Sequence, residues 1–382
     1  MVSFENRTDV SQHYESDRAV CDAKPPKDLE RLLALDWPVE GQGIDGAIQT
    51  IADALKYSVR TGHPRFMDKL YTGSDPVGMV AELVTAALNT NLHVYSVAPV
   101  FTLYVCAAIY VTISYFFFFL VRMELGTVRE LGKVFYQSSS TVDGVSCPGG
   151  SYSNLLALVT ARSTLFPQSR SLGHPGNLVL FASNDAHYSV SKNAILSGIG
   201  IDNVIKVPTT VDGRIIVAEL RECIAAQVQL GKVPFFINAT AGTTVTGAFD
   251  DFAAIADVAE EFKCWMHVDA CWGGAVAFST KHRHLVAGVA RADSIAWNAH
   301  KMMGVPIQSS ILLTKKSGLL QKCNGKTDAR KREATNCAFQ PSEPATSSTT
   351  KTSTISETRR CSVAVVLISS SSTCPGSTMV CG

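Results

Sequence analysis

Two apolar runs decide how this chain is organised: W-M-H-V-D-A-C-W-G-G at 265–274 and S-I-A-W-N-A-H-K-M-M at 294–303. Each run is typical of a buried strand with a charged side chain at its carboxyl end, Asp269 in the first and Lys301 after the second. Open α/β sheets bind their ligands at that end of their strands. A carboxylate and an amine placed there predict a site for a cationic heteroaromatic cofactor.

Strands and helices alternate around these two runs. Apolar runs of strand length occur at 178–182, 204–207, 235–239, 265–268, 294–297 and 309–314, and helical patterns occur at 150–162, 189–197, 218–229 and 252–261. Such alternation predicts an α/β fold, with a mainly parallel central sheet covered by helices on both faces.

The two charged residues each have a chemical and an ordinary interpretation. Lys301 is the candidate for a covalent Schiff base, because a buried lysine beside a cationic cofactor can lose its proton near neutral pH. Asp269 is the candidate partner of a ring nitrogen, which a carboxylate keeps protonated. The ordinary alternatives are a surface lysine after a strand and an aspartate that caps a helix.

Other side chains are placed to meet the same ligand. His187 is the candidate for stacking on the ring, where an imidazole can also move a proton. The run Gly149-Gly150-Ser151 opens a helix and is a candidate phosphate cup, because glycine lets backbone N–H groups approach an anion. Thr240 and Asn298 lie at strand ends, and Cys271 could lie against the second ring face. A loop histidine or a Pro-Gly-Gly-Ser turn is ordinary when it occurs alone.

Taken together, these motifs resemble the group II pyridoxal-phosphate decarboxylases, in the branch of the glutamate and cysteine sulfinate decarboxylases. The resemblance covers about 45–103 and 123–324. The matching strings are H-P-R-F at 63–66, A-P-V-F at 98–101, P-G-G-S at 148–151, H-Y-S at 187–189, N-A-T-A-G-T-T-V at 238–245, G-A-F-D at 247–250, H-V-D-A at 267–270, W-G-G at 272–274, H-R-H at 282–284 and H-K-M-M-G-V at 300–305.

The resemblance implies the type I, aspartate aminotransferase-like fold, with pyridoxal 5'-phosphate as cofactor and a homodimer whose site lies between the subunits. It implies a carboxy-lyase that removes CO₂ from a small acidic amino acid, a step of carboxylic acid metabolism. By position, the cofactor contacts would be Gly150, Ser151, His187, Thr240, Asp269, Asn298, His300 and Lys301, to which we add Cys271. Lys301 and His187 would be the catalytic residues.

The residues that bear on the choice of substrate resemble different branches of the family. Lys69 stands where the family usually has glutamine, in the loop that meets the distal acid of the substrate, and nearby Tyr71 is more like the cysteine sulfinate or aspartate enzymes. The run 302–305 is more like glutamate decarboxylase. Ala299 and Cys271 also depart from the family, which usually has proline and alanine there. We expect glutamate or cysteine sulfinate, with aspartate as a further candidate.

We divide the chain into an N-terminal helical arm or dimerisation segment at 1–95, a cofactor-binding domain at 96–324 and a Ser/Thr-rich tail at 325–382. The uncharged stretch 97–121 is long enough to cross a membrane. Residues 104–122, however, interrupt a helix of the matching pattern, so we favour an insertion, such as a translated intron, over a membrane helix. A membrane-anchored pyridoxal-phosphate lyase is the alternative.

The tail departs from the family pattern. Another reading frame of 345–371 permits a string like the family's next segment, so we expect a frame-shifted or disordered tail and a missing C-terminal small domain. That domain supplies a carboxylate-binding arginine and a mobile loop, and we therefore expect weak or no turnover. A non-catalytic chain that binds cofactor or dimerises with an intact partner is the alternative.

Composition limits the partners, the cellular compartment and the metals that we expect. A net charge of +1 over 382 residues indicates no nucleic-acid partner. The 11 cysteines have no regular spacing, which favours a reducing compartment, and we expect a cytoplasmic protein. No metal-ligand motif is present, so we expect no metal.

Overall fold

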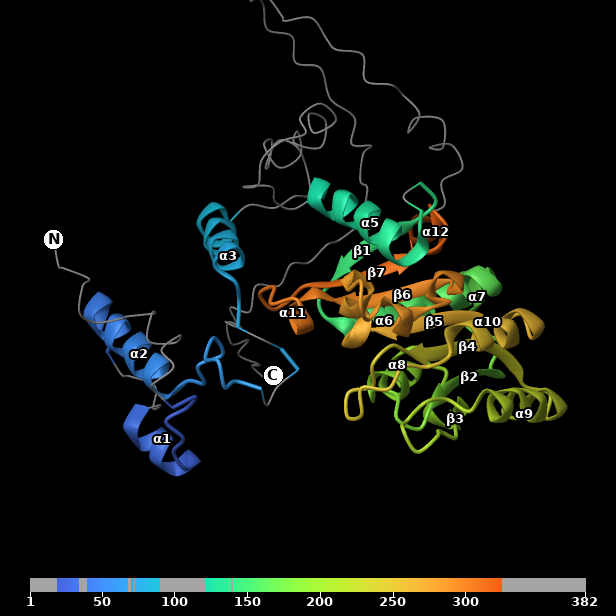
Figure 1. The fold of residues 1–382 in the computed structure, drawn as a ribbon, viewed down its shortest axis with the longest axis horizontal. Helices are drawn as coiled ribbons and strands as arrows, with labels where there is room; N and C mark the ends of the chain where they lie inside the picture. Colours follow the sequence, from blue (N-terminus) through green and yellow to red (C-terminus); the bar gives the residue numbers. More distant parts are fainter. Residues whose placement is uncertain are drawn as a thin grey trace, which may run out of the picture.

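The computed structural model describes residues 19–33, 40–67, 70–71, 73–89, 121–138 and 140–324. Three helices near the N-terminus lie to one side of an α/β domain that holds every described strand (Figure 1). These helices are α1 (Pro26–Leu33), α2 (Gly43–Tyr57) and α3 (Pro76–Leu88).

A seven-stranded sheet in the order β1-β7-β6-β5-β4-β2-β3 forms the centre of the α/β domain. The strands are β1 (Asp143–Cys147), β2 (Leu178–Ser183), β3 (Val204–Val207), β4 (Val233–Thr240), β5 (Trp265–Ala270), β6 (Ser294–Asn298) and β7 (Ser310–Thr314). Neighbours from β3 to β6 pair in parallel, whereas β7 is antiparallel to both β6 and β1. The sheet is mainly parallel, which confirms the predicted fold class.

Helices cover both faces of this sheet. One face packs against α5 (Val121–Tyr136), α9 (Val217–Gln229) and α10 (Phe252–Glu261), and the other packs against α6 (Gly150–Leu165) and α8 (Ser189–Leu196). Strand β2 shows the alternation, because Val179 and Phe181 join the first core while Leu178 and Leu180 join the second. A strand buried on both sides has no polar face, and its sequence is therefore a continuous apolar run.

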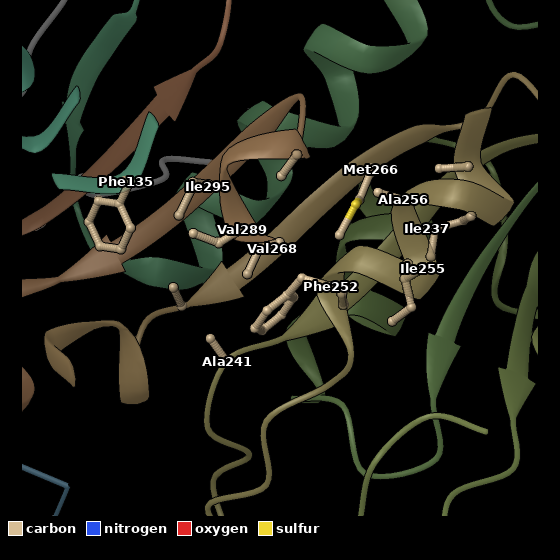
Figure 2. Packing of buried hydrophobic residues seen from close by; sticks show 14 of the residues in the cluster. Phe135, Ile237, Ala241, Phe252, Ile255, Ala256, Met266, Val268, Val289 and Ile295 are labelled. Carbon is tan, nitrogen blue, oxygen red and sulfur yellow. The ribbon is translucent and has the colours of Figure 1, made fainter. Parts of the chain in front are cut away.

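Figure 2 shows the first core, between α10 and the middle strands. Phe252 and Ile255 of α10 face Ile237 of β4 and Met266 of β5, and all four side chains are almost fully buried. Helix α10 begins at this place because Asp251 caps it, accepting the Ala254 N–H at 3.0 Å. The cap and the apolar stripe together fix how the helix lies on the sheet.

Helix α3 meets the α/β domain at its first turn. The Asp75 side chain caps the helix by accepting the N–H groups of Val77 and Gly78 at 2.9 and 3.0 Å. The Asp75 N–H donates to the carbonyl of Gly304 at 3.2 Å. A side chain at Gly78 would collide with Pro306, its Cβ lying 2.5 Å from Cδ. The absence of a side chain at Gly78 therefore allows the first turn of α3 to lie in close contact with Pro306.

The expected helices and strands are present within a few residues of their predicted bounds. Short or polar elements escaped prediction: β1, α7 (Ser169–Leu172), α11 (Ala299–Met302) and α12 (Leu319–Asn324). One bound is corrected. Strand β5 continues to Ala270, because Ala270 still pairs with Trp297 of β6, so Asp269 lies inside the strand and starts no helix.

Several predictions fall outside the described residues. These are the apolar stretch 97–121 except for its last residue, most of the insertion 104–122, and the tail 325–382. The boundaries at 95 and 324 consequently stay predictions. Among the helices that the structure describes, none has the length and apolarity needed to cross a membrane.

Replacing Phe252 with alanine should destabilise the fold by about 3–5 kcal/mol, because the lost ring leaves a cavity between α10 and the sheet. Urea unfolding followed by circular dichroism measures the loss. Val228→Ala on α9 is the matched control, since Val228 is 50% exposed and should change stability by less than about 0.5 kcal/mol. Equal midpoints for the two variants would contradict the assignment of Phe252 to the core.

Candidate cofactor-binding site

A pocket of about 220 Å³ opens at the carboxyl ends of β4, β5 and β6, beside the first turn of α6. All nine residues predicted as cofactor contacts line it: Gly150, Ser151, His187, Thr240, Asp269, Cys271, Asn298, His300 and Lys301. The fold therefore brings together residues from five separate segments. Their roles toward a cofactor stay predictions.

The first turn of α6 forms one wall of the pocket. Gly149 precedes it with a φ of +102°, a conformation that favours glycine, and no side chain caps the helix. A Cβ on Gly150 would lie 2.5 Å from Cys271 Sγ and 2.9 Å from Asn298 Nδ2. The first N–H groups of a 16-residue helix favour an anion, and glycine lets it approach.

Asp269 lies at the base of the pocket and is only 6% exposed. Its Oδ2 accepts from Asn154 Nδ2 at 2.8 Å, and its Oδ1 accepts the Cys271 N–H at 3.1 Å. Both oxygens are held, and each retains a lone pair for a ligand. The carboxylate is thus oriented by neighbours on α6 and on its own strand.

Thr240 lies beside Asp269, because the two residues are register partners of β4 and β5. The Thr240 N–H donates to Asp250 Oδ2 at 2.7 Å, and the Ile215 N–H donates to Asp250 Oδ1 at 2.7 Å. Burial raises the pKa of Asp250 to about 6, although these bonds oppose the rise. The buried Thr240 Oγ1 has no hydrogen-bond partner among the described residues.

His187 enters from the loop between β2 and α8. The Ser189 N–H donates to His187 Nδ1 at 3.2 Å, so Nδ1 is an acceptor and a neutral ring carries its proton on Nε2. Burial lowers the pKa of His187; nearby Asp269 opposes that effect and Lys301 adds to it. The site therefore contains a neutral imidazole at pH 7.

Lys301 and His300 come from α11, the short helix after β6. His300 is fixed by the Ser309 backbone, whose N–H donates to Nδ1 at 3.0 Å, and burial lowers the pKa of His300. Asn298 ends β6, and its Oδ1 accepts from Ser310 Oγ at 2.6 Å, which leaves the Asn298 amide N–H groups for the pocket. Lys301 thus enters the pocket beside His300 and Asn298, whose side chains are both fixed by hydrogen bonds.

Cys271 packs against the turn at Gly150. Burial, together with the Asp269 charge, raises the pKa of its thiol well above the usual range, so the thiol stays protonated. A protonated thiol behaves as a small apolar group in the wall of the pocket.

Five lining residues were not among the predicted site residues: Asn154, Tyr188, Gly242, Thr244 and Trp272. Asn154 could have been found, because it follows Gly150 by four residues and shares its helix face. Of the two substrate candidates, Lys69 lies outside the described residues. Tyr71 does not line this pocket, and the centroid of its ring lies 5.7 Å from that of the Phe66 ring.

These groups fit pyridoxal 5'-phosphate. The buried carboxylate of Asp269 suits a protonated ring nitrogen, Lys301 offers an amine, and the start of α6 suits a phosphate. Thr240 Oγ1, which has no partner among the described residues, offers a further polar contact in the pocket wall. Fold and site together are those of a pyridoxal-phosphate enzyme of the type I fold.

The chain belongs to the pyridoxal-dependent decarboxylases. The model of the pyridoxal-dependent decarboxylase conserved domain matches residues 26–329, which is most of the chain. This confirms the resemblance seen in the sequence, and pyridoxal phosphate is the cofactor of the family.

Individual relatives agree with this placement. A glutamate decarboxylase of Drosophila melanogaster is 42% identical over 309 residues, which are 80% of this chain and 56% of that protein. Mouse CSAD in its apo form superposes with a TM-score of 0.74 at 38% identity, covering 83% of this chain and 63% of the other. A third structure is the glutamate decarboxylase domain of the diaminobutyrate-pyruvate transaminase and L-2,4-diaminobutyrate decarboxylase of Vibrio parahaemolyticus. It superposes with a TM-score of 0.72 at 30% identity, covering 82% of this chain and 66% of the other. The chain thus spans a little more than half the length of the Drosophila relative.

Gly150→Ala should weaken pyridoxal phosphate binding at least about tenfold, because the new methyl meets Cys271 Sγ and Asn298 Nδ2 at the phosphate wall. Titration of the purified apoprotein, followed by cofactor absorbance, measures the affinity. Adding Cys271→Ala should recover part of the loss by removing the closer contact. Gly126→Ala on α5 is the control, since no atom of the described residues lies within 4 Å of a Cβ built there. Unchanged binding by Gly150→Ala would show that the cofactor does not approach this turn.

Proposed function

We propose that this chain carries the cofactor site of an enzyme that removes CO₂ from the α-carbon of a small acidic amino acid. The single observation that supports this most is the pocket in which buried Asp269, Lys301 and the start of α6 meet. The similarity to a glutamate decarboxylase and to mouse CSAD supports the acidic class of substrate.

Each residue would have a distinct task. When bound, pyridoxal phosphate supplies an electron sink for the bond that breaks at the α-carbon. Asp269 would keep the ring nitrogen protonated, and Lys301 would hold the cofactor covalently. The first turn of α6, through Gly150 and Ser151, would bind the phosphate, while the His300 ring supports the wall beside Lys301.

His187 would lie over the ring of the cofactor. Its Nδ1 is occupied by Ser189, so the proton on Nε2 is the one available to the ligand. A neutral ring with a defined proton can stack on the cofactor and take part in proton transfer.

The identity of the acidic substrate is a finer part of this proposal. We infer glutamate or cysteine sulfinate, with aspartate as a further candidate, from Lys69, Tyr71 and the run 302–305. We also propose a cytoplasmic location, and this part of the proposal rests on cysteine usage alone.

The purified protein loaded with pyridoxal phosphate should release CO₂ at most slowly, and the release should be faster from one of glutamate, cysteine sulfinate or aspartate than from tryptophan. Lys301→Ala should abolish release and remove the absorbance band of covalently held cofactor. Lys315→Ala, in the loop after β7, is the matched control and should leave both unchanged. Preference for tryptophan would contradict the acidic class, and a loaded protein that releases no CO₂ would favour the non-catalytic alternative.

We also propose that the N-terminal helices pair with a second copy of this chain. Helices α1 and α2 have no buried residue, and α3 buries only Ala81. The apolar side chains of Ile44, Ile51 and Leu83 are 79%, 55% and 69% exposed. Exposed apolar side chains on helices that bury so few residues favour a protein partner, and identical chains most often associate as twofold dimers.

Ile44→Asp and Leu83→Asp should each convert dimer to monomer at micromolar concentration, because a charge would have to be buried at the contact. Sedimentation velocity measures the mass. Val211→Asp is the control, as Val211 is fully exposed in a turn of the α/β domain. A wild-type protein that sediments as one chain would refute the pairing.

A further inference from the structure

Behind the pocket, a line of buried polar side chains crosses from the sheet to the two groups that would face the cofactor ring. In order, its members are Trp265, Ser294, His267 and Asn154, after which the line divides to Asp269 on one side and to Ser189 and His187 on the other. The successive contacts measure between 2.8 and 3.2 Å. His267, Ser294 and Trp265 do not line the pocket.

The direction of the bonds can be read from the Asp269 end. An ionised carboxylate only accepts, so the group that faces Asp269 Oδ2 must be the amide nitrogen of Asn154. The same nitrogen faces Ser189 Oγ at 3.2 Å. The amide oxygen of Asn154 then faces His267 Nε2 at 3.0 Å, and His267 must donate to it.

The other end is compatible with the same direction. The indole N–H of Trp265 can only donate, and it donates to Ser294 Oγ at 2.8 Å. The Ser294 hydroxyl is then free to donate to His267 Nδ1, also at 2.8 Å. The Asp269 end thus places a proton on Nε2, and a neutral ring that carries this one proton accepts at Nδ1, as the Trp265 end allows.

The surroundings of His267 keep it neutral. Its side chain is fully buried and stacks on Phe236, with ring centroids 5.6 Å apart. Burial lowers the pKa of His267 to about 4, although nearby Asp269 acts in the opposite direction. His267 is two residues before Asp269 on β5, so both side chains leave the same face of the sheet.

We propose that His267 is a positioning residue of this site: by donating from Nε2 it locks the Asn154 amide, which in turn orients Asp269 and the Ser189–His187 pair. The role toward the cofactor rests on the proposed function above. Without that donor the Asn154 amide can rotate by half a turn, which places its oxygen against the Asp269 carboxylate. One amide thus links the candidate partner of the ring nitrogen with the candidate stacking residue.

The test compares two amides at one buried position. In His267→Gln the side-chain nitrogen can reach the place of Nε2 and donate to Asn154, whereas the shorter side chain of His267→Asn reaches only the place of Nδ1. We expect His267→Gln to bind pyridoxal phosphate within about twofold of wild type and His267→Asn about tenfold more weakly. Apoprotein thermal unfolding of both variants identifies any general loss of folding.

A second measurement needs no variant and no cofactor. Nitrogen-15 NMR of imidazole-labelled wild-type apoprotein, with His267 assigned through its contact with Phe236, should show a protonated Nε2 and an unprotonated Nδ1 from pH 5 to 8. The opposite tautomer, or a charged ring at pH 7, would overturn the proposal. Equal cofactor binding by both variants would overturn it as well.

The two proposals fail in different ways. A wild-type protein with the expected tautomer that does not bind pyridoxal phosphate would refute the proposed cofactor site, and with it the role of the line toward a ligand. A wild-type protein that binds cofactor while His267→Asn binds equally well would refute the positioning role alone.

Discussion

The burial of the Asp269 carboxylate is the constraint on which the site depends. A carboxylate removed from water is costly unless donors replace the lost hydration. The protein supplies Asn154 from α6 and the backbone N–H of Cys271. Helix α6 therefore serves twice, because its first turn at Gly150 faces the ligand while Asn154, one turn later, holds the acid.

The parts of the fold that follow from local chemistry could be predicted. Strands buried on both faces appear as apolar runs, and helices between them appear as periodic patterns, so the α/β class and most elements were predicted from sequence. The place of the pocket followed from one rule, that parallel strands present their carboxyl ends at one edge. Thr240 and Asp269 meet there as register partners, and Asn298 follows Ala296, the β6 partner of Asp269, by two residues.

The parts that depend on register or on side-chain direction could not be predicted in this way. Asn154 and His267 are 113 residues apart, and only the packing of α6 on β5 makes them neighbours. His267 stands in an apolar strand, where its sequence context is the same as that of a solitary core histidine. Strand β1 was missed because D-G-V-S-C lacks an apolar run and is recognisable only through its pairing with β7.

The spread of the pocket along the chain links ligand binding to folding. Its walls come from residues between Gly150 and Lys301, so no short stretch of the unfolded chain can hold the ligand. A ligand that binds only the folded state stabilises it by mass action, by about 2.7 kcal/mol when its concentration is a hundred times the dissociation constant. The supply of cofactor would then influence the folded fraction of this chain as well as its chemistry.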